Sequence, residues 1–275
     1  MTAKTLTGYN AGVSMKPLKL FWHDSKTNFG DWLSPILCER LSGRRVVHAK
    51  PNKCDLIAVG SILQRAKHGR FRRRIHVWGS GFIENREETR SYHYYHAVRG
   101  HKTAKLLKSP EIRTFGDPGL LSDLLFPDYR HVAKQCLLGI VPHYKDQKDT
   151  NIQRFADENP NVRVIDILSP GEDFLRQVAI CEFVLSSSLH GLITADAFGI
   201  PNAWIKLSDK VRGQGFKFHD YYSVFGIESP APLDLTSDMS PEKIAELADR
   251  YKRPNLARIK EQLLNAFPFQ KPREL

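Results

Sequence analysis

The clearest indication of the fold class is the segment Phe183-Val-Leu-Ser-Ser-Ser-Leu-His-Gly-Leu-Ile-Thr-Ala-Asp-Ala-Phe-Gly-Ile-Pro201. Its apolar first residues, Phe183–Ser186, predict a buried strand, and a helix is predicted from His190 to Phe198. A further apolar run, Ala203–Leu207, predicts a second strand directly after the helix. A strand, a helix and a strand in this order predict a right-handed unit whose two strands are parallel.

The same alternation runs through the rest of the chain. Apolar strand patterns and amphipathic helix patterns follow one another on both sides of a polar segment, Pro127–Lys134. We therefore predict an α/β fold of two Rossmann-like domains, each with a parallel sheet, and a cleft between them. The other predicted strands are Leu18–Trp22, Val46–His48, Leu56–Gly60, Ile75–Gly79, Tyr95–Arg99, Cys136–Val141 and Val162–Ile167, and the other predicted helices are Trp32–Leu41, Lys102–Leu107, Asn151–Glu158 and Pro170–Ile180.

The polar segment also sets the expected domain boundaries. Residues 1–14 are small and polar and are expected to form a tail. An N-terminal domain is expected over residues 15–130, and a C-terminal domain over residues 131–240. A C-terminal helical segment, 241–275, follows, in which Pro241–Phe267 is expected to be one long amphipathic helix interrupted near Pro254.

Composition restricts the partners of the protein. The 275 residues are 41% hydrophobic and 26% charged, which is typical of a folded protein. Lys and Arg number 41 against 30 Asp and Glu, and the formal net charge of +11 favours anionic partners. Residues 1–14 lack the apolar core of a signal peptide, and no apolar run is long enough to span a membrane. We therefore expect a cytoplasmic protein.

The predicted helix start at His190 and Gly191 is a candidate anion site. A helix N-terminus presents unpaired N–H groups and a partial positive charge. Three hydroxyl groups directly precede it, on Ser186, Ser187 and Ser188. A histidine at such a place can donate a proton if its pKa lies near neutrality. The alternative is purely structural, with the serines capping the helix and the histidine hydrogen-bonded to nearby backbone.

Six short motifs occur in a fixed order that chance does not readily produce. In chain order they are Asn28-Phe-Gly-Asp31, Ala97-Val-Arg-Gly100 with Thr103, Gly116-Asp-Pro-Gly119, Val141-Pro-His-Tyr144, Ser187-Ser-Leu-His-Gly-Leu192 with Phe198-Gly-Ile-Pro201, and Lys217-Phe-His-Asp-Tyr-Tyr222. Together they resemble the signature of the polysaccharide pyruvyl transferase family, and the last resembles the branch acting on bacterial exopolysaccharides. Each motif alone is weak.

The resemblance implies a fold and a reaction. The fold would be like that of the GT-B glycosyltransferases, with phosphoenolpyruvate (PEP) in the cleft, the PEP side in the C-terminal domain and the acceptor side in the N-terminal domain. The enzyme would transfer the enolpyruvyl group of PEP to two hydroxyls of a hexose, in an exopolysaccharide or its lipid-linked precursor. A pyruvate ketal forms and phosphate leaves. No cofactor and no metal are expected, and the sequence contains no HExxH motif or Cys/His cluster.

The implied reaction requires an acid, a base and cations. His190 is the expected acid and Asp31 a candidate base, although an Asp opening a helix is also a usual cap. Many family members carry Arg where this chain has Ser188, so Arg212 or Lys217 is expected to replace it. The expected PEP-binding residues are Ser187, Ser188, Arg99, Arg212 and Lys217, and the expected acceptor-binding residues are Asn28, His143, Asp220 and Tyr221. Each of these roles has a structural alternative. His143 could be hydrogen-bonded within the fold, Asp117 could form a turn, and Tyr221 and Tyr222 could belong to the core.

The basic run Arg65–Arg74 holds six Lys or Arg in ten residues. It could contact an anionic membrane leaflet that carries a lipid-linked acceptor, which would place the protein on the inner face of the plasma membrane. It could also be a nucleic-acid patch or a solvated basic loop. Two rival functions remain open. One is a GT-B glycosyltransferase using a nucleotide sugar. The other is a nucleic-acid-binding protein, which we do not expect because no helix-turn-helix, RRM or zinc-finger pattern is present.

Overall fold

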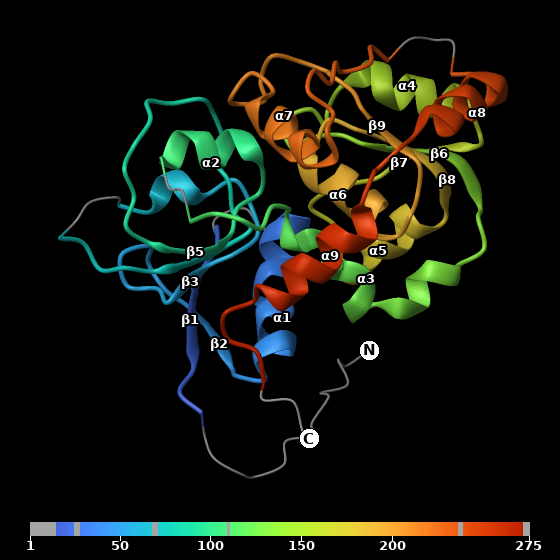
Figure 1. Cartoon of the computed structure of the whole chain (residues 1–275). Coiled ribbons are helices and arrows are strands. Elements are labelled where there is room, and N and C mark those ends of the chain that lie inside the picture. The colour runs from blue at the N-terminus through green and yellow to red at the C-terminus, as the bar shows by residue number, and fades with distance from the viewer. Residues whose placement is uncertain (1–14, 25–27, 68–70, 109–110, 236–238, 272–275) are drawn as a thin grey trace.

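The protein contains two parallel sheets with helices packed on their faces (Figure 1). The computed structural model describes residues 15–24, 28–67, 71–108, 111–235 and 239–271. The predicted tail, 1–14, and residues 68–70 of the basic run lie outside the described residues. The predicted α/β class is confirmed, and both sheets are parallel throughout their described pairs.

The first sheet has the strand order β2-β1-β3-β4-β5. Its two faces are covered by different helices, because neighbouring residues of a strand point to opposite sides. In β3, Leu56 packs with α1 and α9, whereas Ile57 packs with α2. The strands are β1 Leu18–Phe21, β2 Val46–His48, β3 Leu56–Ile57, β4 His76–Trp78 and β5 Tyr94–Ala97, and the helices are α1 Phe29–Ser42, α2 His101–Leu107 and the 3-10 helix η1 Leu63–Arg65.

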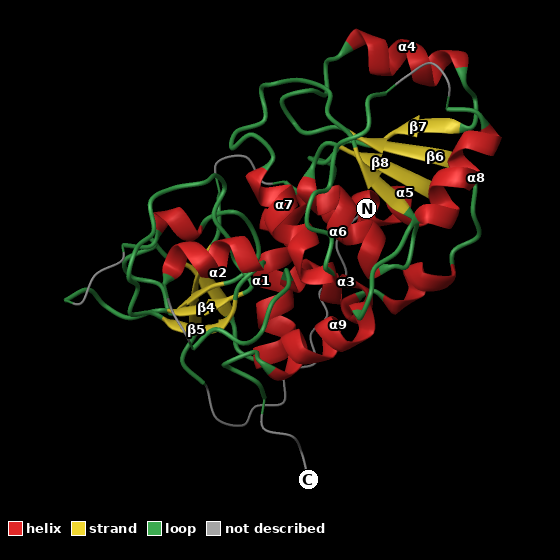
Figure 2. Ribbon diagram, turned by 45° about the horizontal axis from the view of Figure 1, so that its top comes forward, coloured by secondary structure: helices red, strands yellow, loops and turns green. Residues whose placement is uncertain are grey.

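The second sheet has the order β7-β6-β8-β9 and is also covered on both faces (Figure 2). One face packs against α4 and α8, and the other against α5 and α6. Strand β8, helix α6 and strand β9 form the parallel unit that the sequence predicts over 183–207. The elements are β6 Cys136–Val141, β7 Val162–Val164, β8 Cys181–Ser186, β9 Asn202–Trp204, α4 Thr150–Glu158, α5 Gly171–Ala179 and α6 Leu189–Ala197.

The C-terminal segment is helical and is interrupted near Pro254, as the sequence predicts. The chain forms two helices, α8 Pro241–Arg250 and α9 Leu256–Asn265. Pro254 lies between them, and its ring disfavours the helical conformation at the preceding residue. Helix α8 packs on the second sheet, whereas α9 returns to the first, where the carbonyl of Leu263 accepts a hydrogen bond of 2.8 Å from Trp78 Nε1.

The remaining helices are short. They are η2 Pro118–Leu121, α3 Ser122–Leu125, η3 Pro127–His131, α7 Phe216–Tyr222 and η4 Ser223–Phe225. Asp117 has the turn role that the sequence allowed, since its Oδ1 accepts from Gly119 N at 2.9 Å. Among the described residues, no helix is both long and apolar enough to cross a membrane.

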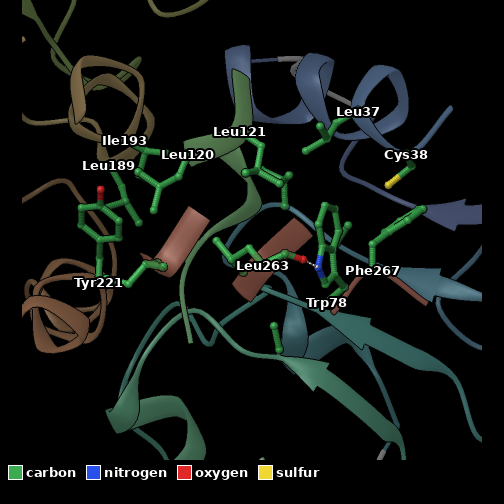
Figure 3. Close-up of a cluster of buried hydrophobic side chains, with 14 of the residues drawn as sticks. Leu37, Cys38, Trp78, Leu120, Leu121, Leu189, Ile193, Tyr221, Leu263 and Phe267 are labelled. Atoms are coloured by element: carbon green, nitrogen blue, oxygen red, sulfur yellow. Dashed lines mark hydrogen bonds between the residues drawn. The ribbon is translucent and has the colours of Figure 1, made fainter. Parts of the chain in front are cut away.

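One hydrophobic cluster joins the two sheets. It includes Trp78 from the first sheet, Leu120 from η2, Leu189 and Ile193 from α6, and Tyr221 from α7. Figure 3 shows these side chains around the end of α9. The inner face of α6 is therefore packed firmly against the first-sheet half. As a result, the N-terminus of α6 faces loops from both halves.

Candidate active site

A cavity of about 610 Å³ lies where the carboxyl ends of both sheets meet. Loops that follow β1, β3, β6 and β8 contribute to its wall, as expected for ligand sites in open α/β sheets. Seven residues predicted as site residues line it: Asn28, Asp31, His143, Ser188, His190, Arg212 and Lys217. The structure thus brings together motifs that are up to 189 positions apart, counting from Asn28 to Lys217.

The serines before α6 hold the loop that supports the cavity. Ser186 Oγ accepts from Ser188 N at 3.0 Å, and Ser187 Oγ accepts from His143 N at 2.8 Å. A side chain at Gly191 would lie 2.3 Å from Ser186 Oγ, so only glycine fits there. Ser188 is the N-cap of α6 but makes no side-chain capping bond, and it lines the cavity. The N-terminus of α6 therefore opens toward the cavity.

His190 lies in the first turn of α6 with its ring against Gly30 of α1. A Cβ at Gly30 would lie 2.1 Å from His190 Cε1. The ring atom Nε2 is shielded from solvent and has no hydrogen-bond partner among the described residues. Burial, together with the positive charges of Lys217 and Arg99, lowers the pKa of His190 to about 3. His190 is therefore a neutral imidazole whose Nε2 has no hydrogen-bond partner among the described residues, and the structural alternative of a hydrogen-bonded histidine does not account for this nitrogen.

Lys217, in the first turn of α7, is a nearly buried cation. Its side chain lines the cavity while the residue is only 8% exposed. Its Nζ lies 5.2 Å from the ring centroid of Phe218. Among the described residues no carboxylate forms an ion pair with it, and the charge of Asp146 offsets only part of the fall in its pKa. Burial and the charges of Arg99 and Lys145 lower its pKa to about 7. A desolvated cation without a counter-ion is costly, and such groups concentrate at functional sites.

Asn28 and Asp31 begin helix α1 on the opposite wall. Asn28 is the N-cap, and its Oδ1 accepts from Gly30 N at 3.0 Å. Its amide Nδ2 donates to Asp31 Oδ2 at 2.6 Å. Capping thus belongs to Asn28 and not to Asp31. Burial raises the pKa of Asp31 to about 7, so this carboxyl can exchange a proton near neutrality.

Arg212 also lines the cavity, but it is exposed and already paired. Its Nε and NH2 groups contact the two carboxylate oxygens of Glu84 at 2.8 and 2.5 Å. This pair joins the loop after β9 to the loop after β4. His143 lines the cavity as well, and burial followed by the charges of Lys217 and Lys145 lowers its pKa to about 3.

The structure does not bring Arg99 and Asp220 to the cavity. Both are 0% exposed, and Arg99 Nε donates to Asp220 Oδ2 at 3.0 Å. Arg99 also donates to Ser61 Oγ and to the carbonyl of Phe82. Asp220 accepts in addition from the backbone N and the hydroxyl of Thr103, each at 2.7 Å. These two residues therefore fasten α7 to the start of α2 and cannot contact a ligand in this conformation.

Tyr221 is likewise part of the interior. It is 0% exposed, and its hydroxyl donates to Asp196 Oδ2 at 2.6 Å. Asp196 also accepts from Tyr251 at 2.8 Å and from Arg253 Nε at 2.9 Å. The core position that the sequence allowed for the tyrosines thus describes Tyr221. Ser187, already engaged with His143, lines a neighbouring cavity of about 570 Å³.

Several cavity residues lie outside the six sequence motifs. His23, Gln64 and Lys145 line the wall. Lys145 follows the predicted strand end at His143, and this position was the available clue. Its Nζ donates to the carbonyl of Lys210 at 3.0 Å. Among the residues that the structure describes, no three His, Cys, Asp or Glu side chains gather as they would around a metal ion.

Comparisons with known proteins point to one family. The family model for polysaccharide pyruvyl transferase matches residues 3–209. The chain is 29% identical to uncharacterized protein L143 of Acanthamoeba polyphaga mimivirus over 228 residues, which cover 78% of this chain and 76% of the relative. It is 28% identical to succinoglycan biosynthesis protein ExoV of Rhizobium meliloti (strain 1021) over 222 residues, which cover 78% of this chain and 66% of the relative.

Proposed function

The chain belongs to the polysaccharide pyruvyl transferase family, and from that premise we propose that it transfers the enolpyruvyl group of PEP to two hydroxyls of a hexose. The acceptor is a saccharide of an exopolysaccharide or its lipid-linked precursor. The name of the relative ExoV, a succinoglycan biosynthesis protein, supports such an acceptor. The product is a pyruvate ketal, and inorganic phosphate is released.

One observation carries the assignment of PEP to the cavity. Lys217 places an ammonium group without a counter-ion beside the unused Nε2 of His190 and the open N-terminus of α6. A buried cation and a helix N-terminus together favour an anion, and PEP carries both a phosphate and a carboxylate. Lys217 then supplies the positive charge that many family members place at the position of Ser188. Arg212, paired with Glu84, is a further cation of the cavity wall, which also includes Arg65 and Lys145.

His190 is the proposed proton donor to the methylene carbon of PEP. Its pKa is about 3, because burial and the positive charges of Lys217 and Arg99 oppose the imidazolium. A bound phosphate and carboxylate bring negative charge next to the ring, and that charge raises the pKa of His190. The enzyme is therefore expected to charge this histidine only when PEP is present. Proton transfer makes the adjacent carbon an oxocarbenium-like electrophile.

Asp31 and Asn28 are proposed to act on the acceptor. One sugar hydroxyl adds to the electrophilic carbon and loses its proton, for which the Asp31 carboxylate is the base. The C–O bond to phosphate then breaks, and the second hydroxyl closes the ketal as its proton passes to the departing phosphate. Asn28 holds Asp31 through the 2.6 Å hydrogen bond, so the carboxylate keeps one orientation while it exchanges a proton. His143 lines the same wall and is the remaining proposed acceptor contact.

Calorimetric titration of PEP into the protein tests the donor assignment. Lys217→Ala should weaken binding by about 2 kcal/mol, or about thirtyfold, because a charged contact is lost. Lys252→Ala is the matched control, since Lys252 is exposed and does not line the cavity. Equal PEP affinity in wild type and Lys217→Ala would refute the role of Lys217. Binding of a nucleotide sugar in place of PEP would favour the glycosyltransferase alternative.

A further inference from the structure

A second concentration of positive charge lies far from the cavity. A groove of about 550 Å³ runs along the amino-terminal edge of the first sheet, next to the starts of β1, β3 and β4. Five cations line it, and Asp55 is the one carboxylate among its described lining residues. Five positive charges less one leave +4 in the groove, counting His76 as neutral. The cations are Lys16, Lys19, Arg44, Arg73 and Arg74.

Several of these cations are held in place by neutral groups. Arg44 Nε donates to the carbonyl of Lys16 at 2.9 Å, and its guanidinium lies 5.4 Å from the ring centroid of Phe269. Arg74 donates to the carbonyl of Tyr92 and lies over the ring of Tyr94 at 3.9 Å. Their charges therefore remain available to an external anion.

An exposed aromatic side chain lies close in the sequence to two arginines that line this groove. Phe71 is 97% exposed and is followed directly by Arg72, Arg73 and Arg74. Phe71–Arg74 belong to a loop that projects from the body of the protein beside the first sheet (Figures 1 and 2). A phosphate or a nucleic acid would satisfy the cations alone. A membrane surface satisfies both features, because arginines bind lipid phosphates while an aromatic ring enters the interface.

We propose that Phe71–Arg74, together with the basic groove, docks the protein on an anionic lipid surface. Phe71 inserts among the headgroups, and the cations of the groove bind lipid phosphates. The surface consists of described residues alone and does not include 68–70. The docking does not depend on the reaction.

The positions of the residues of the basic run relate this docking surface to the candidate active site. Arg65, at the start of the run, lines the candidate active-site cavity, whereas Arg73 and Arg74, at its end, line the groove. The described ends of the run therefore lie on one side of the first-sheet half, Arg65 at the cavity and Arg73 and Arg74 at the opposite edge of the sheet. Contact along this side would keep the cavity close to a lipid-linked saccharide, and this consequence rests on the proposed function.

Cosedimentation with vesicles tests the docking. Wild-type full-length protein should bind vesicles of equal parts phosphatidylglycerol and phosphatidylcholine, and pure phosphatidylcholine should not retain it. The variant Lys19→Ala/Arg72→Ala/Arg73→Ala should bind about a hundredfold more weakly, because each basic residue near such a surface contributes several-fold. Phe71→Ala should weaken binding about tenfold, since an inserted aromatic ring is lost.

Matched variants separate this surface from net charge. Arg154→Ala/Arg163→Ala/Arg176→Ala removes three exposed arginines from the second-sheet half, and Leu124→Ala removes another exposed apolar side chain. Both should bind vesicles as wild type does. The proposal would be overturned if the two triple variants lost vesicle binding equally, or if Lys19→Ala/Arg72→Ala/Arg73→Ala bound vesicles as wild type does. It would also be overturned if the protein bound a random DNA duplex more tightly than vesicles and Phe71→Ala did not change that binding. PEP affinity should stay unchanged in all of these variants. If the wild-type protein bound vesicles but did not bind PEP, the proposed function would be refuted and the docking proposal would stand.

Discussion

The ring of His190 occupies the space that a side chain at Gly30 would need. A Cβ built on Gly30 would lie 2.1 Å from His190 Cε1, closer than any real contact. The glycine of the Asn28–Asp31 motif is therefore required by a histidine on the opposite wall of the cavity. The two motifs form one structural unit, although they are 160 positions apart in the chain.

Gly30→Ala should displace the His190 ring and impair catalysis. We expect phosphate release from PEP to fall about a hundredfold, as for loss of a general acid, and the free energy of unfolding to fall by about 1–3 kcal/mol from overpacking. Gly30→Ala/His190→Ala removes the ring that clashes, so it should recover the stability but not the activity. A stable, fully active Gly30→Ala protein would show that the ring need not stay where the structure places it.

Asp31→Asn should stabilise the protein at alkaline pH. The folded pKa of Asp31, about 7, is above its ordinary value of 3.8, so the fold favours the protonated form. The resulting stability is fully present below pH 3.8 and is lost as pH rises to about 7, because the buried carboxyl must then ionise. Asparagine avoids that penalty, which is about 4 kcal/mol for a shift of this size.

Chemical denaturation at pH 4 and pH 8 measures this effect. The difference in unfolding free energy between Asp31→Asn and wild type should be larger at pH 8. Asp157→Asn, on the exposed side of α4, should show no such difference between the two pH values. A difference for Asp31→Asn that does not change with pH would mean that the carboxyl is not buried in the folded protein. Acceptor-dependent turnover should nevertheless be lost in Asp31→Asn if Asp31 is the base.

Lys217→Met should stabilise the empty protein while weakening PEP binding. The folded pKa of Lys217, about 7, is below its ordinary value of 10.5. The penalty for burying the ammonium is absent above pH 10.5, grows as pH falls and is complete below about pH 7. Thermal unfolding at pH 6 should therefore give a higher Tm for Lys217→Met than for wild type. Added PEP should raise the Tm of wild type and have little effect on the variant. A lower Tm for the empty variant would show that Lys217 has a stabilising partner.

Asp220→Ala should destabilise the fold without removing a residue that contacts PEP. Removing one partner of a buried ion pair costs about 3–5 kcal/mol, since Arg99 keeps an uncompensated charge. The folded fraction should bind PEP more tightly than Lys217→Ala does. Urea denaturation and calorimetry on the same preparations compare the two effects. Wild-type stability combined with a raised acceptor KM would instead support the acceptor-binding role that the sequence suggested for Asp220.

The sequence predicts local structure where an apolar run has clear ends and a helix has recognisable capping residues. The unit from β8 to β9 follows from the apolar start at Phe183 and the glycine and serines around His190. Helix α7 was not predicted, because it is short and follows Gly215, which has φ +83. The order of the first sheet, with β1 between β2 and β3, depends on contacts between distant segments that no local pattern contains.

The candidate site shows the same division. The order of the motifs was sufficient to predict a shared site for Asn28, Asp31, His143, His190 and Lys217, and all five line one cavity. Arg99 lies in the motif next to them, yet its burial is determined by Asp220, which is 121 positions away. An arginine that binds a ligand and an arginine that ties two helices together look identical in sequence. Only the packing of α7 against α2 distinguishes them.

Phosphate release from PEP is the most direct test of the central claim, that His190 protonates PEP for transfer to a saccharide. Wild type and His190→Ala should be compared, with and without galactose-, mannose- and glucose-containing acceptors, and the acceptor analysed by mass for the added pyruvate ketal. We predict acceptor-dependent release by wild type and a loss of about a hundredfold or more in the variant. Acceptor-dependent release that is undiminished in His190→Ala would contradict the role of His190. Failure of wild type to bind PEP, together with binding of a nucleotide sugar, would contradict the pyruvyl transfer itself.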